Sequence, residues 1–299
     1  MHRSLRAGQS TAIRRLPGRF PDRTELTMRK HILEAVRAHA AGCYPTESCG
    51  LIVAVGRSHK YVPCENTATD PSEEFRIAPE QYAAAEEQGE VIGIVHSHPD
   101  ATSRPSPRDL AMCEATGLPW YILSWPEGDL RTVAPTGHAP LLGRPFVHGA
   151  WDCWQVCADW YKREWGLEFP AYAREDGWWE KPDGPSLYEQ AFEAAGFYQV
   201  SQPQRGDMIV MAVGRTAHPN HAGIYLGADA RLPEESAEVF GPGPFMLHHL
   251  LGRPSEIIVF GGPWLDRTRL VLRHQGAERG GKEKALNAMC RLDERDSEL

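Results

Sequence analysis

The sequence predicts two domains of mixed class, an α/β domain followed by an α+β domain. At 299 residues, the chain is about twice as long as a typical domain. A stretch rich in proline and glycine, residues 134–145, divides it near the middle. Helix and strand patterns alternate before this stretch, whereas after it helices come first and strands follow. The first order is typical of an α/β domain, and the second is typical of an α+β domain with an antiparallel sheet.

In the first half, apolar residues spaced three and four apart predict helices, and short β-branched runs predict strands. The expected helices span 28–41, 79–88 and 107–116, and the expected strands span 50–55, 91–95 and 120–124. The second half is expected to begin with a helix over 152–165 and a loop rich in Trp, Pro and Gly. After that loop we expect a helix over 186–195 and strands over 208–213, 222–226, 245–249 and 256–260.

These patterns also set the expected domain boundaries. We expect the α/β domain over 28–134, a linker over 135–145, the α+β domain over 146–275 and a frayed, charged tail over 276–299. Residues 1–27 hold six arginines but no apolar stretch, which is not typical of a secretory signal. We expect these residues to form a disordered arm, or the natural chain to start at Met28.

The charge balance and the cysteine count exclude several classes of protein. With 32 basic and 40 acidic side chains, the formal net charge is −8, which disfavours a protein that coats nucleic acid or an anionic membrane. Seven cysteines are an odd number and too few for a disulfide framework, so we expect a reducing compartment. No apolar run approaches the roughly 18 residues of a membrane span. We therefore expect no nucleic-acid partner and no membrane span.

Two histidines directly follow the buried strand that is expected over 91–95. Because His96 and His98 are two positions apart, in an extended chain they share a face and lie about 6.6 Å apart, so both rings can reach one metal ion. With 13 histidines in the chain, one such pair arises by chance about half the time. Asp109, after ten intervening residues, would add an oxygen ligand. Two histidines and one carboxylate leave the fourth position of a tetrahedral zinc ion open, as a catalytic zinc site requires.

Two further residues are candidates for this site. Taken alone, Ser106 and Asp109 are more typical of a helix start with a serine N-cap, and that cap would itself fix Asp109 in place. Glu47 stands just before the strand expected over 50–55. Alone it would be a surface acid, but a buried glutamate beside a metal ion can act as a general base.

Together these residues resemble the JAMM (MPN) metallopeptidase family. Its pattern is a glutamate, then H-x-H followed by ten residues and an aspartate, with a serine three before the aspartate, and every element is present here. The resemblance implies that His96, His98 and Asp109 bind Zn²⁺, that Glu47 activates a water molecule, and that Ser106 helps to stabilise the oxyanion. It also implies that peptide or isopeptide bonds are cleaved.

A cysteine stands at the start of the helix that is expected over 152–165. Cys153 in the first turn would face the positive end of the helix dipole, which favours the thiolate form. A lone cysteine is more often an inert core residue, and Cys157, one turn later, is the candidate for that role. We expect Cys49 to be a small core residue as well.

Histidines in the later strands could serve this thiol. His221 stands at the head of the strand expected over 222–226, although a lone histidine there is more often a surface residue. A thiolate nucleophile needs a base, and the base needs a group that orients it. His248 in a neighbouring expected strand could orient His221, and the adjacent His249 is the alternative.

The second half resembles the NlpC-type cysteine peptidases, papain-like enzymes that cut the peptide stems of the bacterial cell wall. Their marks are Asp-Cys at a helix start, a Gly-Asp turn before a strand, and the run His-(Ala/Val)-Gly-Ile-Tyr-x-Gly. All three are present, at residues 152–153, 206–207 and 221–227. The resemblance implies that Cys153 is the nucleophile, His221 the base and His248 the orienting residue.

Two features depart from this family. An acidic insert over 228–244 separates the strands expected to carry His221 and His248. The family also often places a tyrosine about a dozen residues before the nucleophile, where it contributes to the oxyanion hole. Residues 141–146 contain no tyrosine. Either another donor serves, or the activity is weak.

The pairing of the two domains resembles a family of tail assembly proteins of lambda-like phages, from about Met28 to His274. The resemblance implies a tail-tip protein with two peptidase sites, whose partners are bacterial peptidoglycan peptides and other tail-tip proteins. Such a protein would occur in the host cytoplasm during assembly and at the tail tip of the virion. The alternatives are an assembly scaffold with little catalysis and a housekeeping cell-wall hydrolase of a bacterium.

Overall fold

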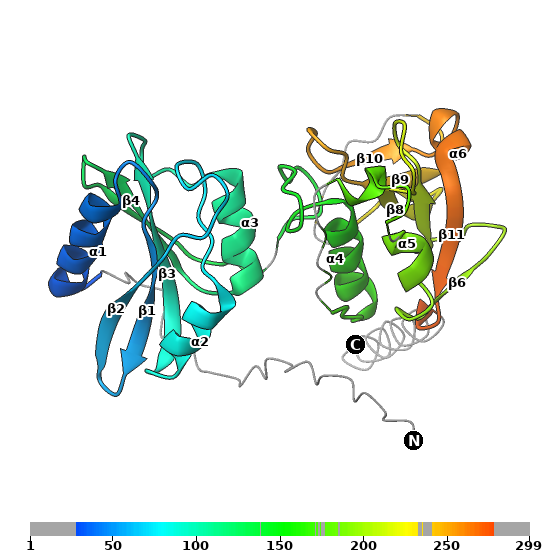
Figure 1. Cartoon of the computed structure of the whole chain (residues 1–299). Coiled ribbons are helices and arrows are strands. Elements are labelled where there is room, and N and C mark those ends of the chain that lie inside the picture. Colours follow the sequence, from blue (N-terminus) through cyan, green and yellow to red (C-terminus); the bar gives the residue numbers. More distant parts are fainter. Residues whose placement is uncertain are drawn as a thin grey trace, which may run out of the picture.

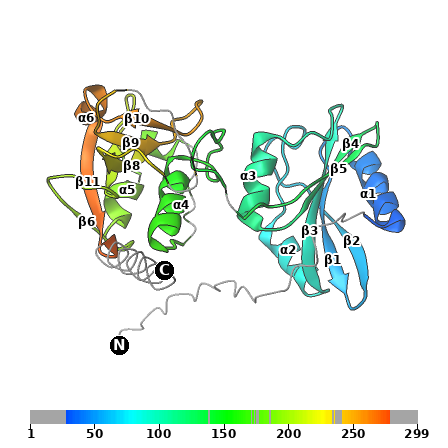
Figure 2. The same ribbon diagram turned by 180° about the vertical axis from the view of Figure 1, so that it is seen from behind.

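Two β-sheets, one in each half of the chain, organise the molecule (Figure 1). The computed structural model describes residues 28–277 apart from 138, 171, 173, 175–176, 185, 233–234 and 236–240. The expected N-terminal arm, and the expected tail beyond residue 277, lie outside these residues. In views from both sides the two sheets lie in separate lobes, joined by the segment that follows β5 (Leu130–Val133) (Figure 2).

The first sheet is mixed and has the strand order β2-β1-β3-β4-β5. Its other strands are β1 (Cys49–Val55), β2 (Ser58–Cys64), β3 (Glu90–Pro99) and β4 (Trp120–Trp125). Among the described pairs of this sheet, β3 and β4 are parallel and the rest are antiparallel. Its helices are α1 (Lys30–Cys43), α2 (Pro79–Glu86) and α3 (Pro107–Thr116). β3 and β4 run parallel, so the chain must cross from the end of β3 back to the start of β4. α3 lies in this connection.

Each face of this sheet has its own core, since side chains along a strand alternate between the faces. Leu51 and Val53 pack on one face with Cys113 of α3. Ile52 packs on the other face with Val36 of α1. The short apolar strand β1 is therefore buried on both sides, which fixes its register against β3.

The second sheet is antiparallel and has the order β10-β9-β8-β7-β11-β6. Its strands are β6 (Phe197–Gln199), β7 (Met208–Met211), β8 (His221–Gly227), β9 (Phe245–His248), β10 (Glu256–Val259) and β11 (Thr268–His274). The helical elements are α4 (Cys153–Trp165), the short 3₁₀ helix η1 (Trp178–Glu180), α5 (Leu187–Ala191) and α6 (Pro263–Arg267). The buried face of α4, which includes Val156 and Trp160, packs in one core with β8. None of the helices in the described part of the chain is long and apolar enough to cross a bilayer.

The predicted fold class is confirmed, with an α/β first domain and an α+β second domain that has an antiparallel sheet. Each predicted helix and strand overlaps an observed one, although α5 ends at Ala191, well before the predicted end. The elements that the sequence does not predict are β2, β5, β6, β11, η1 and α6. Of these, β2, β5 and β6 lie at the edges of the sheets, where few side chains are buried and the apolar pattern is weak.

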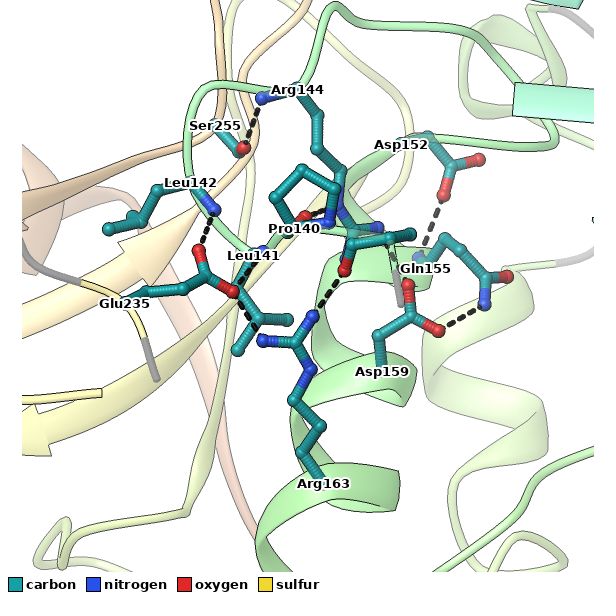
Figure 3. Close-up of polar contacts among 11 residues, drawn as sticks. Pro140, Leu141, Leu142, Arg144, Asp152, Gln155, Asp159, Arg163, Glu235 and Ser255 are labelled. Atoms are coloured by element: carbon teal, nitrogen blue, oxygen red, sulfur yellow. Dashed lines mark hydrogen bonds and ion pairs between the residues drawn. The ribbon is translucent and has the colours of Figure 1, made fainter. Parts of the chain in front are cut away.

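The segment expected as a linker is packed against the second domain. Leu141 and Arg144 are fully buried. The carboxylate of Glu235, from the acidic insert, accepts hydrogen bonds from the backbone N–H groups of Leu141 at 2.6 Å and Leu142 at 2.8 Å (Figure 3). The same carboxylate pairs with Arg163 of α4. We call this set of contacts the Glu235 clasp.

The two halves also meet through α3. Ala111 packs with Val147, Ala150 and Trp151, which precede α4. Glu114 of α3 accepts a hydrogen bond of 2.6 Å from the backbone N–H of Thr136. One helix of the first domain thus contacts the chain segment that leads into the second.

Candidate active sites

The first candidate site lies at the C-terminal end of β3. The strand stays extended through His96 and His98, so both side chains project from the same face. The ring of His96 is fully buried, stacked on Phe75 with 4.6 Å between ring centroids and edge-on to Trp120 at 5.5 Å. Nδ1 of His98 lies 2.9 Å from the carbonyl oxygen of Thr102. A proton on that Nδ1 leaves the lone pair of Nε2 free for a metal ion.

The first turn of α3 supplies the third side chain. Oγ of Ser106, the N-cap, accepts a hydrogen bond from the backbone N–H of Asp109 at 3.1 Å. In return, Oδ2 of Asp109 accepts one from the backbone N–H of Ser106 at 2.7 Å. This capping box confirms the predicted helix start, and it fixes the aspartate within the first turn. One local motif therefore both begins the helix and orients its acid.

The three side chains converge on one point. Nε2 of His96 lies 3.0 Å from Nε2 of His98 and 3.3 Å from Oδ1 of Asp109, and Nε2 of His98 lies 3.4 Å from Oδ2 of Asp109. A tetrahedral zinc ion with bonds of about 2.0–2.1 Å separates its ligand atoms by about 3.3–3.4 Å. Two imidazole nitrogens this close also need a shared proton or cation between them. The donor set and its spacing therefore fit one tetrahedral divalent ion.

The charge state of Asp109 also suits a metal ligand. Burial raises its pKa, but its hydrogen bonds with His96 and His98 outweigh burial and hold the pKa below the usual range. The carboxylate is therefore ionised, as a ligand must be when it binds a metal ion.

Glu47 reaches this site through the pairing of β1 with β3. The backbone N–H of Ser97 donates to the carbonyl of Ser48 at 3.0 Å, and the same antiparallel register sets Glu47 opposite His98. Glu47 is buried, and burial raises its pKa to about 8. A carboxyl group with a pKa near neutrality can take up and return a proton at physiological pH.

A cavity of about 320 Å³ adjoins two of the three converging side chains, those of His98 and Asp109. Glu47, His98, Ser106 and Asp109 all line it, together with apolar side chains such as Phe75. The Oγ of Ser106 accepts the capping hydrogen bond, so the hydrogen of its hydroxyl group can still be donated. The structure therefore places both additional candidates, Glu47 and Ser106, on the wall of the cavity that His98 and Asp109 also line.

The second candidate site lies at the N-terminus of α4. Asp152 is the N-cap, and its carboxylate accepts hydrogen bonds of 2.9 Å from the backbone N–H groups of Gln155 and Gly149. Cys153 is consequently the first residue of the helix. Its Sγ lies 3.9 Å from the carbonyl oxygen of Asn220, which directly precedes β8. This contact brings the thiol next to the head of β8.

The histidine pair lies across β8 and β9. Nε2 of His221 lies 2.9 Å from Nδ1 of His248. Trp264 of α6 stands edge-on to the His248 ring at 4.8 Å. His249 points to the opposite face of β9, where it meets Phe146 at 5.1 Å. Of the two adjacent histidines, His248 is therefore the one in contact with His221.

Burial decides the charge of this site at rest. It raises the pKa of Cys153 to about 11; the charge of Asp152 adds to this and the Tyr188 hydroxyl opposes it. Burial, together with the neighbouring His248, holds the pKa of His221 well below its usual range. The resting pair is a thiol and a neutral imidazole. Burial of the thiol therefore opposes the helix dipole, which favours the thiolate form.

Sequence reasoning missed Tyr188 of α5. Its hydroxyl oxygen lies 3.4 Å from Sγ of Cys153, and the side chain is buried. The helical spacing over 186–195 predicts that this stretch packs inward, but nothing in it places the tyrosine beside a cysteine 35 positions earlier. Residues 141–146, which precede the nucleophile, contain no tyrosine. Tyr188 instead brings a phenolic hydroxyl group to the thiol of Cys153.

Comparisons with known proteins follow the same division of the chain. Residues 29–135 match the family of prokaryotic homologs of the JAB domain, and residues 143–252 match the NlpC/P60 family. The chain is similar to tail tip assembly protein K of Escherichia phage N15, with 42% identity over 249 residues that cover 83% of this chain and 96% of that protein. The chain belongs to the tail tip assembly protein K family.

Two further relatives match most or part of the chain. Tail tip assembly protein K of Escherichia phage lambda is 34% identical over 201 residues, which cover 67% of this chain and 89% of that protein. The desampylase of Haloferax volcanii is 30% identical over 117 residues, which cover 36% of this chain and 84% of that protein. The chain is thus a tail tip assembly protein with a JAB (JAMM/MPN) domain followed by an NlpC/P60 domain, in the order that the sequence predicts.

Proposed function

We propose that this tail tip assembly protein is a hydrolase with two peptidase centres, a zinc centre in the first domain and a cysteine centre in the second. The observation that supports the proposal is that one chain brings together two groups of candidate reactive side chains. Ligand atoms of His96, His98 and Asp109 lie within 4.8 Å of one another. The His221–His248 pair lies beside the residue that contacts Cys153.

At the first centre, His96, His98 and Asp109 would hold Zn²⁺. A bound zinc ion would supply Lewis acidity, which polarises the carbonyl of a peptide or isopeptide bond. Glu47 takes a proton from the attacking water molecule and returns it to the leaving amine. Ser106 donates its hydroxyl hydrogen to the carbonyl oxygen as negative charge develops there. The raised pKa of Glu47 and the shared cavity support these roles.

At the second centre, Cys153 is the nucleophile. Because Nε2 of His221 is occupied by His248, Nδ1 of His221 accepts the thiol proton. Sγ attacks the carbonyl carbon, the C–N bond breaks, and the amine leaves with the proton from His221. Water then hydrolyses the thioester on Cys153. His248 holds the imidazole in place, and the Tyr188 hydroxyl donates to the developing oxyanion.

The substrates we propose follow from the families that the two domains match. The cysteine centre hydrolyses peptide links of bacterial peptidoglycan during assembly or infection. The zinc centre cuts a peptide or isopeptide bond of another tail-tip protein during assembly. The protein therefore acts in the host cytoplasm while tails assemble and at the tail tip of the virion.

Release of soluble muropeptides from purified peptidoglycan tests the cysteine centre. We expect the full-length wild type to release peptides and Cys153→Ala to release none, since the variant lacks the nucleophile. A variant with His96→Ala and His98→Ala should still release them, because its cysteine centre is intact. Release by Cys153→Ala equal to that of the wild type would refute the proposal, and the masses of the fragments identify the bond.

An assembly scaffold is the second candidate function. The observation that favours it is the high pKa of Cys153, because a protonated thiol is a weak nucleophile. Complementation of a phage that lacks this protein separates the two candidates. Full tail assembly by a chain that carries both Cys153→Ala and His98→Ala would support the scaffold, whereas loss of assembly in a chain that stays folded would support catalysis.

A further inference from the structure

The ring of His248 has one nitrogen that the contact with His221 does not use. This atom, Nε2, is buried and has no hydrogen-bond partner among the described residues. Oε1 of Glu256 lies 3.8 Å from it, and this oxygen is also buried without a hydrogen-bond partner in the described part of the chain. Buried polar atoms are costly when they stay unpaired, so a donor and an acceptor this close are natural partners.

The pairing of β9 with β10 sets the two side chains together. His248 and Glu256 are directly opposite each other in this antiparallel ladder, so their side chains project from the same face. Oε1 of Glu256 also lies 3.6 Å from Nη1 of Arg253. The side chain of Arg253 is 63% exposed, whereas that of His248 is 1% exposed. Water can therefore solvate the guanidinium in place of Glu256, but it cannot reach Nε2 of His248.

Glu256 discriminates between the two tautomers of His248. Burial lowers the pKa of His248 to about 4, so at neutral pH the ring carries a single proton. With that proton on Nε2, the ring donates toward Oε1 of Glu256. With the proton on Nδ1, the lone pair of Nε2 would face an oxygen that can only accept, which is repulsive. Glu256 therefore favours the tautomer that has its proton on Nε2.

The tautomer of His248 in turn sets the tautomer of His221, since Nδ1 of His248 lies 2.9 Å from Nε2 of His221. When Nδ1 of His248 has a lone pair, Nε2 of His221 must carry the proton and donate it. Nδ1 of His221 then has a lone pair and can accept the proton of a thiol. In the opposite arrangement Nδ1 of His221 already carries a proton, and the ring cannot act as a base.

We propose that Glu256 is a positioning residue of the cysteine centre, and that it selects the tautomers in which His221 can take the proton of Cys153. It acts through His248 rather than on the reacting atoms. The inference rests on the proposed cysteine peptidase and adds a further residue to its site. An approach of about 1 Å would turn the 3.8 Å contact into a hydrogen bond, and such bonds often tighten when substrate binds.

The ring nitrogens of His221 and His248 report the tautomers directly. In ¹⁵N NMR spectra of the full-length protein labelled at histidine, a nitrogen with a proton and a nitrogen with a lone pair have well separated chemical shifts. At neutral pH we expect both rings of the wild type to carry the proton on Nε2. A proton on Nδ1 of His221 in the wild type would overturn the proposal without any variant.

Two variants separate Glu256 from its neighbour. Glu256→Met keeps the length of the side chain but removes the acceptor, so the ratio of the two tautomers should fall about tenfold. The matched control, Arg253→Met, removes the other contact of Glu256 and should keep the wild-type tautomers. On muropeptides, Glu256→Met should lower kcat about tenfold with KM within about twofold, and Arg253→Met should change neither. Wild-type tautomers in Glu256→Met, or equal effects of the two variants, would contradict the proposal.

The two proposals fail separately, because the tautomers are measured without catalysis. If they follow Glu256 while peptidoglycan releases no peptides, the positioning role stands and the cell-wall activity falls. If peptides are released but Glu256→Met has the kcat of the wild type, the peptidase stands and the positioning role falls.

Discussion

The first candidate site consists of two histidines and an aspartate that lie close together in the sequence. The spacing of His96, His98 and Asp109 fits one tetrahedral ion. We therefore expect about one zinc ion per chain in the purified protein, measured by mass spectrometry of the metal content. The double variant His96→Ala, His98→Ala should lose it, whereas His31→Ala, at an exposed histidine, should keep it. An equal zinc content in the double variant and the wild type would show that the metal binds at another site.

Tyr188 supplies the second test at the scale of one residue. Removal of its hydroxyl by Tyr188→Phe should lower kcat on muropeptides by about 10²–10³-fold and change KM little, because the donor acts on charge that develops in the transition state. The same change at Tyr198, which is 40% exposed, is the matched control. An unchanged kcat for Tyr188→Phe would show that this hydroxyl takes no part in oxyanion stabilisation.

At the scale of the element, two buried neutral imidazoles stand at the end of β9, His248 as its last residue and His249 directly after it. Burial lowers the pKa of both His248 and His249 from about 6.5 to about 4. Between these values the unfolded chain binds more protons than the folded one, so the free energy of unfolding rises with pH across the window. We expect the stability to fall as the pH is lowered from about 6.5 to about 4.

His249→Gln isolates the contribution of the second of these imidazoles to the pH dependence of stability. The variant cannot be protonated at this position, so its loss of stability between pH 7 and pH 5 should be smaller than that of the wild type by on the order of 1 kcal/mol. Urea unfolding at the two pH values measures this difference. If both proteins lose the same stability, protonation of His249 is not coupled to unfolding.

The elements that the sequence predicts correctly share one property, which is a strong local pattern. Buried strands such as β1 and β7 are continuous apolar runs, and the start of α3 follows from Ser106, Pro107 and Asp109 alone. Edge strands bury few side chains, so β2 leaves little pattern to read. β11 is missed although it lies inside its sheet, because charged residues interrupt its apolar ones.

A strong local pattern also explains which site residues could be predicted from the sequence. His96 and His98 lie on one strand, and their common face follows from the period of two. Contacts such as that of Tyr188 with Cys153 depend on how the segment between α4 and α5 folds back, which no local pattern encodes. The choice of His248 over His249 requires both the alternation of side chains along β9 and the register of β8 against β9, and the sequence does not give the register.

At the scale of the whole molecule, the Glu235 clasp fixes the joining segment. The carboxylate of Glu235 accepts hydrogen bonds from two backbone N–H groups and forms an ion pair with Arg163. All of these groups are largely buried. Glu235→Gln removes the charge and one acceptor oxygen, so it should cost about 1–3 kcal/mol and lower the Tm of the second domain by several degrees. The matched control is Glu193→Gln, at an exposed position of the same domain.

Limited proteolysis provides the second measurement on the clasp. Cleavage within residues 139–144 should be slow in the wild type and faster in Glu235→Gln, because the variant releases a segment that Leu141 and Arg144 otherwise bury. Calorimetry and proteolysis should change together. A variant that melts and is cleaved like the wild type would show that the clasp adds nothing to stability.

The clasp also bears on how such a protein can be recombined between genomes. Leu141 and Leu142 lie before the first helix of the second domain in the chain, yet their backbone hydrogen bonds are completed by a residue more than 90 positions later. A crossover that replaces the first domain must therefore fall upstream of Ala139. One that falls between Ala139 and Asp152 would replace part or all of residues 139–144 with a foreign segment, while Glu235 would still come from this chain. The retained second domain would then lack the joining segment that its own insert binds.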